Sequence, residues 1–317
     1  MTTDVATPPA PPESGTSGKH VAEGPAAAPA PPKVRRRRRL TPAGAVVVWS
    51  ALALGFLAVW LVAFALVLSG VQESRTQKLA YDQLREKLAA ATAPLGGAIV
   101  PGTPVAVLDA PSIGLAQVVV EGTSAMAMQD GPGHRRDTVL PGQAGTSVVY
   151  GRSVMFGAPF AKVPQLAPGT QLKVTTGQGE FTYVVDRVRR AGDPVPAALQ
   201  PGKGRLVLVT SEGEGWQGRL APTTTVFVDA TLTGDAQPTK AGRPASVVDA
   251  ERPMGHDSAS LLALMLWLQL FVVASVALVW AWYRWGRWQT WLVGMPLLLA
   301  ILWGLGENAV AFLPNLV

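Results

Sequence analysis

The chain has 317 residues, a net charge of +6, 48% hydrophobic residues and no cysteine. The lack of cysteine excludes disulfides and thiolate chemistry. Five of the positive charges form one run, Arg35 to Arg39, directly before an apolar block. That position indicates a membrane-topology signal rather than a nucleic-acid site, because no aromatic residues are interleaved with the arginines.

Residues 1–42 are rich in proline and alanine, and we expect a disordered cytoplasmic tail that carries the arginine run. Residues 43–69 are almost continuously apolar. They exceed the roughly 20 residues that cross a bilayer, so we expect an uncleaved first transmembrane helix. A cleaved signal peptide is the alternative, but its apolar region is normally only about 7–15 residues long.

Residues 70–99 change character and predict an amphipathic stalk helix. Tyr81, Leu84 and Leu88 recur at helical spacing, while charged residues occupy the other faces. We expect this helix to lean on the domain that follows.

Residues 100–235 show an apolar period near two, interrupted by glycine, proline and aspartate. Many short strands with turns between them indicate an all-β sandwich or barrel. The expected strands are Val105–Leu108, Ala116–Glu121, Thr146–Gly151, Gln171–Thr175, Phe181–Val188, Arg205–Thr210 and Thr224–Leu232.

Residues 236–257 are polar and predict a linker back to the membrane. Residues 258–283 and 290–313 predict a second and a third transmembrane helix, with Arg284 and Arg287 in the short connection. If the first span runs outward, both positive clusters lie in the cytoplasm. The predicted protein is thus a multi-pass plasma-membrane protein with a cytoplasmic N-terminus and an extracellular β domain and C-terminus.

One stretch of the β domain carries the strongest motif. Leu206-Val207-Leu208-Val209-Thr210-Ser211 reads as a buried strand that ends in small polar residues before a glycine-rich loop, after which no helix is expected. Other segments recur in a characteristic order: Ala110-Pro111-Ser112-Ile113-Gly114-Leu115, Gly131-Pro132-Gly133-His134, Pro141-Gly142-Gln143-Ala144-Gly145 and Tyr150-Gly151. Together they resemble the sortase family, in particular its actinobacterial class E and F-like members. The resemblance implies an all-β, eight-stranded barrel, here combined with three transmembrane α-helices.

The resemblance also implies a cysteine that attacks the Thr-Gly carbonyl of a sorting signal, a histidine that protonates the leaving amine, and an arginine that steadies the substrate. Here the cysteine position is Ser211, the histidine position is Arg152, and the arginine candidate is Arg219. A serine hydroxyl needs a base, and a guanidinium is not one. We therefore expect these catalytic positions to be vestigial.

The sequence favours a catalytically inactive, membrane-anchored module at the cell surface, so the protein is predicted not to be an enzyme. It would bind an extended peptide, a cell-wall component or a membrane-protein partner through Arg152, Ser211, Thr210, Arg219 and Glu212. The alternative is a serine-dependent transpeptidase or hydrolase that acts on sorting signals with an unrecognised base, for which His134 is a candidate. A third possibility is that the three spans form an assembly platform. We expect no cofactor and no nucleic-acid partner, and no metal-ligand spacing is present.

Overall fold

The computed structural model describes residues 42–258 and 260–317, without the side chains of residues 42–47, 49–50, Trp216 and Arg219. The expected disordered tail and its arginine run lie outside the described residues. The chain divides into two units, Met1–Trp49 and Ser50–Val317. Apart from the first residues of α1, the features below belong to the second unit.

One long helical segment precedes the β domain. It consists of α1 (Pro42–Ala63), a π-helical stretch (Phe64–Leu68) and α2 (Ser69–Ala89). The stalk helix expected over residues 70–99 forms but ends at Ala89. Its Leu84 is fully buried against Val118. Tyr81 was expected on the same face, but 49% of its surface is exposed.

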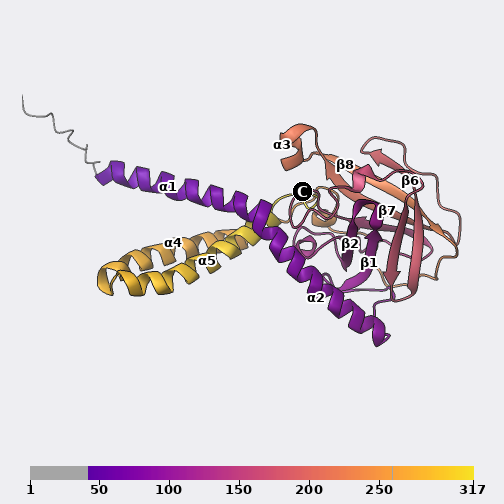
Figure 1. Cartoon of the computed structure of the whole chain (residues 1–317), viewed down its shortest axis with the longest axis horizontal. Coiled ribbons are helices and arrows are strands. Elements are labelled where there is room, and N and C mark those ends of the chain that lie inside the picture. Colours follow the sequence, from indigo (N-terminus) through magenta and orange to yellow (C-terminus); the bar gives the residue numbers. More distant parts are fainter. Residues whose placement is uncertain (1–41, 259) are drawn as a thin grey trace, which may run out of the picture. The chain divides into compact units, whose positions relative to one another are not determined.

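Eight strands close into a barrel in the order β1-β2-β3-β4-β7-β8-β6-β5. Figure 1 labels β1, β2, β6, β7 and β8 of this barrel. Their bounds are β1 Pro104–Ala110, β2 Leu115–Glu121, β3 Gly133–His134, β4 Gly145–Tyr150, β5 Gln171–Thr176, β6 Gly179–Arg190, β7 Gly204–Glu212 and β8 Thr224–Thr233. The predicted eight-stranded barrel is thus confirmed, and every expected strand is present. The sequence missed β3, which has only two residues and so shows no alternation.

The two faces of β7 have different roles. Leu206 and Leu208 belong to the main core inside the barrel. Val207 and Val209 alternate to the other face, where they pack with Tyr150 in a second cluster. Ser211 shares the face of Val207 and Val209 by the same alternation. The expectation that no helix follows β7 is wrong, because α3 (Gly215–Leu220) comes directly after the glycine-rich turn.

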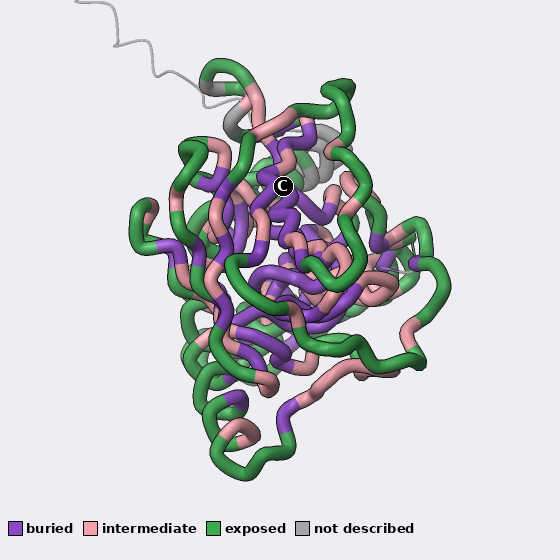
Figure 2. The backbone as a smooth tube through the Cα atoms, turned by 90° about the vertical axis from the view of Figure 1, so that its right-hand side faces the viewer, coloured by how far each residue is buried: buried purple, intermediate pink, exposed green. Residues whose placement is uncertain are grey.

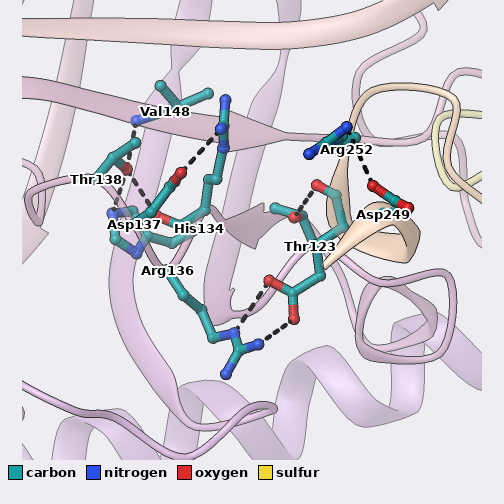
Figure 3. A network of polar contacts seen from close by, with 10 residues as sticks. Thr123, His134, Arg136, Asp137, Thr138, Val148, Asp249 and Arg252 are labelled. Carbon is teal, nitrogen blue, oxygen red and sulfur yellow. Dashed lines mark hydrogen bonds and ion pairs between the residues drawn. The ribbon is translucent and has the colours of Figure 1, made fainter. Parts of the chain in front are cut away.

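The polar connection after β8 packs against the barrel. Glu251 is buried and lies in a short 3-10 helix (Asp249–Glu251). Its two carboxylate oxygens bind the guanidinium of Arg136. Thr123 donates its hydroxyl to the backbone oxygen of Glu251 at 2.7 Å. Figure 3 shows Thr123 and Arg136 reaching this 3-10 helix from separate parts of the barrel.

Two antiparallel helices follow, α4 (Ser260–Arg284) and α5 (Arg287–Ala311), which lie side by side in Figure 1. Three helical segments are long and apolar enough to cross a membrane: Ala51–Ala89, Ser260–Arg284 and Arg287–Ala311. These segments overlap the three predicted spans, and the first also includes α2, the predicted stalk helix. After α5 the chain continues through Leu313–Val317. Asn315, Leu316 and Val317 are buried, and the tube in Figure 2 is purple near the C-terminal label.

Candidate functional site

Arg152 and Ser211 lie at the same edge of the sheet because β4 and β7 are parallel neighbours. Tyr150 at the end of β4 pairs with Val209 of β7, and the amide of Gly151 donates to the Val209 carbonyl at 2.9 Å. Residues that follow the same end of two parallel strands emerge at one edge of the sheet. The sequence could place each residue at a strand end, but the parallel pairing that joins them was not evident from it. We call Arg152, Ser153 and Ser211 the β4–β7 site.

Glycine is required at the turn into this site. A Cβ at Gly151 would collide with the ring of Phe160, which is fully buried in the barrel core. Phe160 in turn donates its amide to the backbone oxygen of Arg152 at 2.9 Å. Core packing therefore fixes the backbone from which Arg152 and Ser153 project.

The Ser211 hydroxyl faces two oxygens. It donates to the backbone carbonyl of Leu316 at 2.7 Å, and its oxygen lies 2.8 Å from that of Ser153. In the part of the chain that the structure describes, these are the hydrogen-bond partners of Ser211. Neither a carbonyl nor a neutral hydroxyl removes a proton at neutral pH, so the hydroxyl remains an alcohol.

Arg152 is fully buried and uses its three nitrogens on backbone oxygens. It donates to Ala125 at 2.7 Å, to Met128 at 3.3 Å and to Val317 at 2.9 Å. The guanidinium also lies 4.9 Å from the ring centre of Phe156. Burial lowers the pKa of Arg152 to about 9, which still leaves the group protonated near neutral pH. It is a hydrogen-bond donor at this site and not a base.

The segment that meets these residues was not foreseen as part of the site. Ser153 donates its amide to the Leu316 carbonyl at 3.0 Å, and Leu316 is completely buried. Its side chain packs with Met128, Tyr150 and the outward face of β7. In the sequence, residues 314–317 only follow the last predicted span, and Ser153 is distinguished only by following Arg152.

The remaining expected binding residues lie elsewhere. Thr210 is buried, and strand alternation turns it to the face opposite Ser211. The carboxylate of Glu212 forms an ion pair with Arg190 at 2.9 Å on the surface, so it is directed at that side chain. Arg219 lies in α3, but its side chain is not among those described. Arg152 and Ser211 are thus the expected binding residues that these contacts bring together.

His134 is fully occupied by structural contacts. Its Nδ1 lies 2.8 Å from the carboxylate of Glu121, and its Nε2 lies 2.8 Å from the Val139 carbonyl. A carbonyl only accepts, so Nε2 carries a hydrogen and cannot take up another proton. The side chain is 1% exposed. His134 therefore connects β3 to Glu121 of β2 and to Val139. It does not supply the base that a serine mechanism needs.

Metal ligation finds no support in the described residues, where no group of three or more His, Cys, Asp or Glu side chains is arranged to hold an ion. The groups that the β4–β7 site does offer are hydrogen-bond donors. These are one guanidinium, two hydroxyls and one backbone amide. All of them donate to backbone oxygens of residues 316 and 317 or of neighbouring loops.

Comparison with known proteins assigns most of the barrel to a family. The family model of the sortase domain matches residues 108–222. Sortase D of Bacillus subtilis (strain 168) is 32% identical over 106 residues, which make up 33% of this chain and 52% of that protein. The chain thus spans about half the length of this curated relative.

Similar chains also occur among solved structures. The sortase D5 transpeptidase of Clostridium perfringens is 20% identical with a TM-score of 0.41, and the match covers 50% of this chain and 99% of that one. Sortase E of Streptomyces avermitilis is 29% identical with a TM-score of 0.36, covering 49% and 100%. The family model, the curated relative and the closed barrel agree, and residues 108–222 of this chain are therefore a sortase domain.

Proposed function

We propose that this protein is a catalytically inactive sortase, held at a membrane, whose β4–β7 site binds an extended peptide or a partner segment without cleaving it. The donors of the site support this proposal. Arg152, Ser153 and Ser211 all engage backbone oxygens, and such contacts hold an extended peptide largely independently of its side chains.

The observation that carries the proposal is the surroundings of the Ser211 hydroxyl. Its proton is directed to the carbonyl of Leu316 or to the hydroxyl of Ser153. Nucleophilic attack by serine requires an adjacent group that removes this proton. The neighbouring ionisable group, Arg152, is a protonated donor. Among the described side chains, the site thus offers hydrogen bonds to a peptide but no route for proton transfer.

The test uses the full chain in detergent or nanodiscs. After incubation with a sorting-signal peptide, intact-mass spectrometry should find no acyl adduct, and a fluorophosphonate probe should label the natural chain no more than Ser211→Ala. A stable adduct on Ser211 would overturn the proposal. As a positive control, the double variant Ser211→Cys, Arg152→His restores a thiol and an imidazole, and it should turn over any peptide that reaches the site.

A serine-dependent transpeptidase or hydrolase is the second candidate, and one contact favours it. The Ser153 amide donates to the Leu316 carbonyl at 3.0 Å, as an oxyanion-hole donor would. However, the Ser211 hydroxyl donates to the same carbonyl oxygen, whereas a nucleophile must approach the carbon. Peptide turnover by the natural chain, abolished in Ser211→Ala, would establish this candidate in place of the first.

The proposed location is the plasma membrane, with the sortase domain and residues 313–317 on the outer side. Three membrane-length helices support this topology, because an odd number of spans puts the end of α5 on the side opposite to residues 1–42. The arginine run before the first helix supports a cytoplasmic position for those residues. The contacts of residues 315–317 with the domain agree with a shared side.

A further inference from the structure

Residues 313–317 cover the β4–β7 site from the same chain. They follow α5 directly, and a segment that leaves a helix normally runs over the surface. Here Asn315 and Leu316 are completely buried and Val317 is 6% exposed. Such burial means that the segment fills a position in the domain rather than lying against its outside.

The backbone of this segment is held by the residues that the sortase resemblance places at the reaction centre. The carbonyl of Leu316 accepts from Ser211, at the cysteine position, and from the amide of Ser153. The next backbone oxygen, that of Val317, accepts from Arg152, at the histidine position. The Leu316–Val317 peptide bond therefore lies next to Arg152 and Ser211. A peptide bond of an external peptide would take the same position when that peptide binds the site.

Side chains on either side of this bond are also accommodated. Leu316 packs with Met128, Tyr150 and Val209. Val317 packs with Phe64, Met155 and Phe156. Two separate apolar clusters thus receive two consecutive aliphatic residues, and this arrangement defines the class of sequence that the site accepts.

Asn315 fixes the segment before the aliphatic pair. Its side-chain amide donates to the backbone oxygens of Thr123 at 2.7 Å and Arg252 at 2.9 Å, and its backbone amide donates to Gly255 at 2.9 Å. The acceptors come from the loop after β2 and from the connection after β8. An apolar side chain at this position would leave these buried oxygens without a donor, which selects for an amide.

We propose that the β4–β7 site is a peptide-binding site for the pattern amide–aliphatic–aliphatic, and that residues 313–317 are its resident intramolecular ligand. This inference rests on the proposed function, because only a site that does not cleave can keep its ligand. While the segment is docked, it occupies the same donors that an external peptide needs. A peptide of this class then binds only when the segment leaves.

The first test compares the full chain with a variant that lacks residues 313–317. The probe is the peptide Leu-Pro-Asn-Leu-Val with an N-terminal fluorophore, and fluorescence anisotropy measures its binding. The natural chain should bind it weakly, and the shortened chain should bind it at least about tenfold more tightly, because several hydrogen bonds become available. The same residues in reversed order serve as the control peptide.

Matched variants in the shortened chain assign the binding to the site. Ser211→Ala should weaken peptide binding by about fivefold, as expected for one hydrogen bond. Lys203→Ala changes an exposed residue in the turn before β7 and should leave binding unchanged. Equal binding by the natural and shortened chains would refute the inference, as would a folded shortened chain that does not bind.

A second measurement needs no deletion. The chain has no cysteine, so Val317→Cys introduces a single thiol. Maleimide should label it slowly in the docked segment and faster when excess Leu-Pro-Asn-Leu-Val peptide displaces the segment. A labelling rate that does not respond to the peptide would overturn the inference while leaving the inactive site intact. Conversely, an acyl adduct on Ser211 would overturn the proposed function, whereas the displacement assay would still report on docking.

Discussion

Tyr183 shows how a single hydroxyl can organise a turn of the barrel. This residue of β6 is completely buried, and its oxygen accepts the amide of Gly142 at 2.6 Å. Burial raises the pKa of Tyr183 to about 12, so the phenol stays neutral. Gly142 has a φ of +91° and lies against the ring of Phe181, which excludes a side chain. The Pro141-Gly142 turn is thereby fixed from inside the barrel.

We therefore predict that Tyr183→Phe destabilises the protein by about 1–3 kcal/mol, because the Gly142 amide loses its buried acceptor. Chemical unfolding in detergent measures this change. Tyr81→Phe is the matched control, since Tyr81 lies on α2 with 49% of its surface exposed. Equal stability of the two variants would show that the Gly142 amide finds another partner.

At the same scale, the sequence singled out Arg152 and Ser211, but it did not reveal that both bind the backbone of residues 316 and 317. Arg152 and Ser211 follow apolar runs that end at strand termini, which is a local signal. Ser153 and Leu316 gave no such signal, because the contact between them joins residues that are 163 positions apart in the chain. Long-range backbone contacts have no periodicity that a sequence pattern could reveal.

Among the elements, α2 illustrates how one helix face is tied to the barrel. Leu84 is completely buried and packs in a cluster with Ala80 and Val118. The neighbouring Gln77 exchanges hydrogen bonds with the backbone of Val118, accepting from its amide at 2.7 Å and donating to its carbonyl at 3.0 Å. This docking orients the helix that leads from the first predicted span to β1.

Leu84→Ala should accordingly cost about 2–5 kcal/mol, the range for removing a buried leucine from a packed site. Leu79→Ala changes the same residue type in the same helix, but Leu79 is 61% exposed and its replacement should cost little. The difference between the two free energies of unfolding is the measurement. A small difference would mean that α2 is not held by this contact.

Strand positions were predictable from sequence to within a few residues, because alternation marks each face of a half-buried strand. β3 was not, since Gly133 and His134 are too few to alternate. The parallel pairing of β2 with β3 and of β4 with β7 was also not apparent. Pairing partners depend on the closure of the whole barrel rather than on any one strand.

On the scale of the whole molecule, the proposed topology leads to a labelling experiment in cells. Because the natural chain has no cysteine, single variants give no background. Lys203→Cys, in the exposed turn before β7, should react with a membrane-impermeant maleimide on intact cells. Gln289→Cys, at the exposed start of α5, should react only after permeabilisation. The reverse pattern would invert the topology.

The order of two adjacent hydroxyl residues in β7 has one further consequence. Side chains along a strand point alternately to its two sides, so sliding β7 by one position against β4 would expose Thr210 outward and turn Ser211 into the barrel. The same slide would carry Leu206 and Leu208 out of the core. Burial of Leu206 and Leu208 thus fixes the register of β7 against β4. Because of this register, Ser211 and not Thr210 faces the β4–β7 site, although the two leucines lie on the other face of the strand.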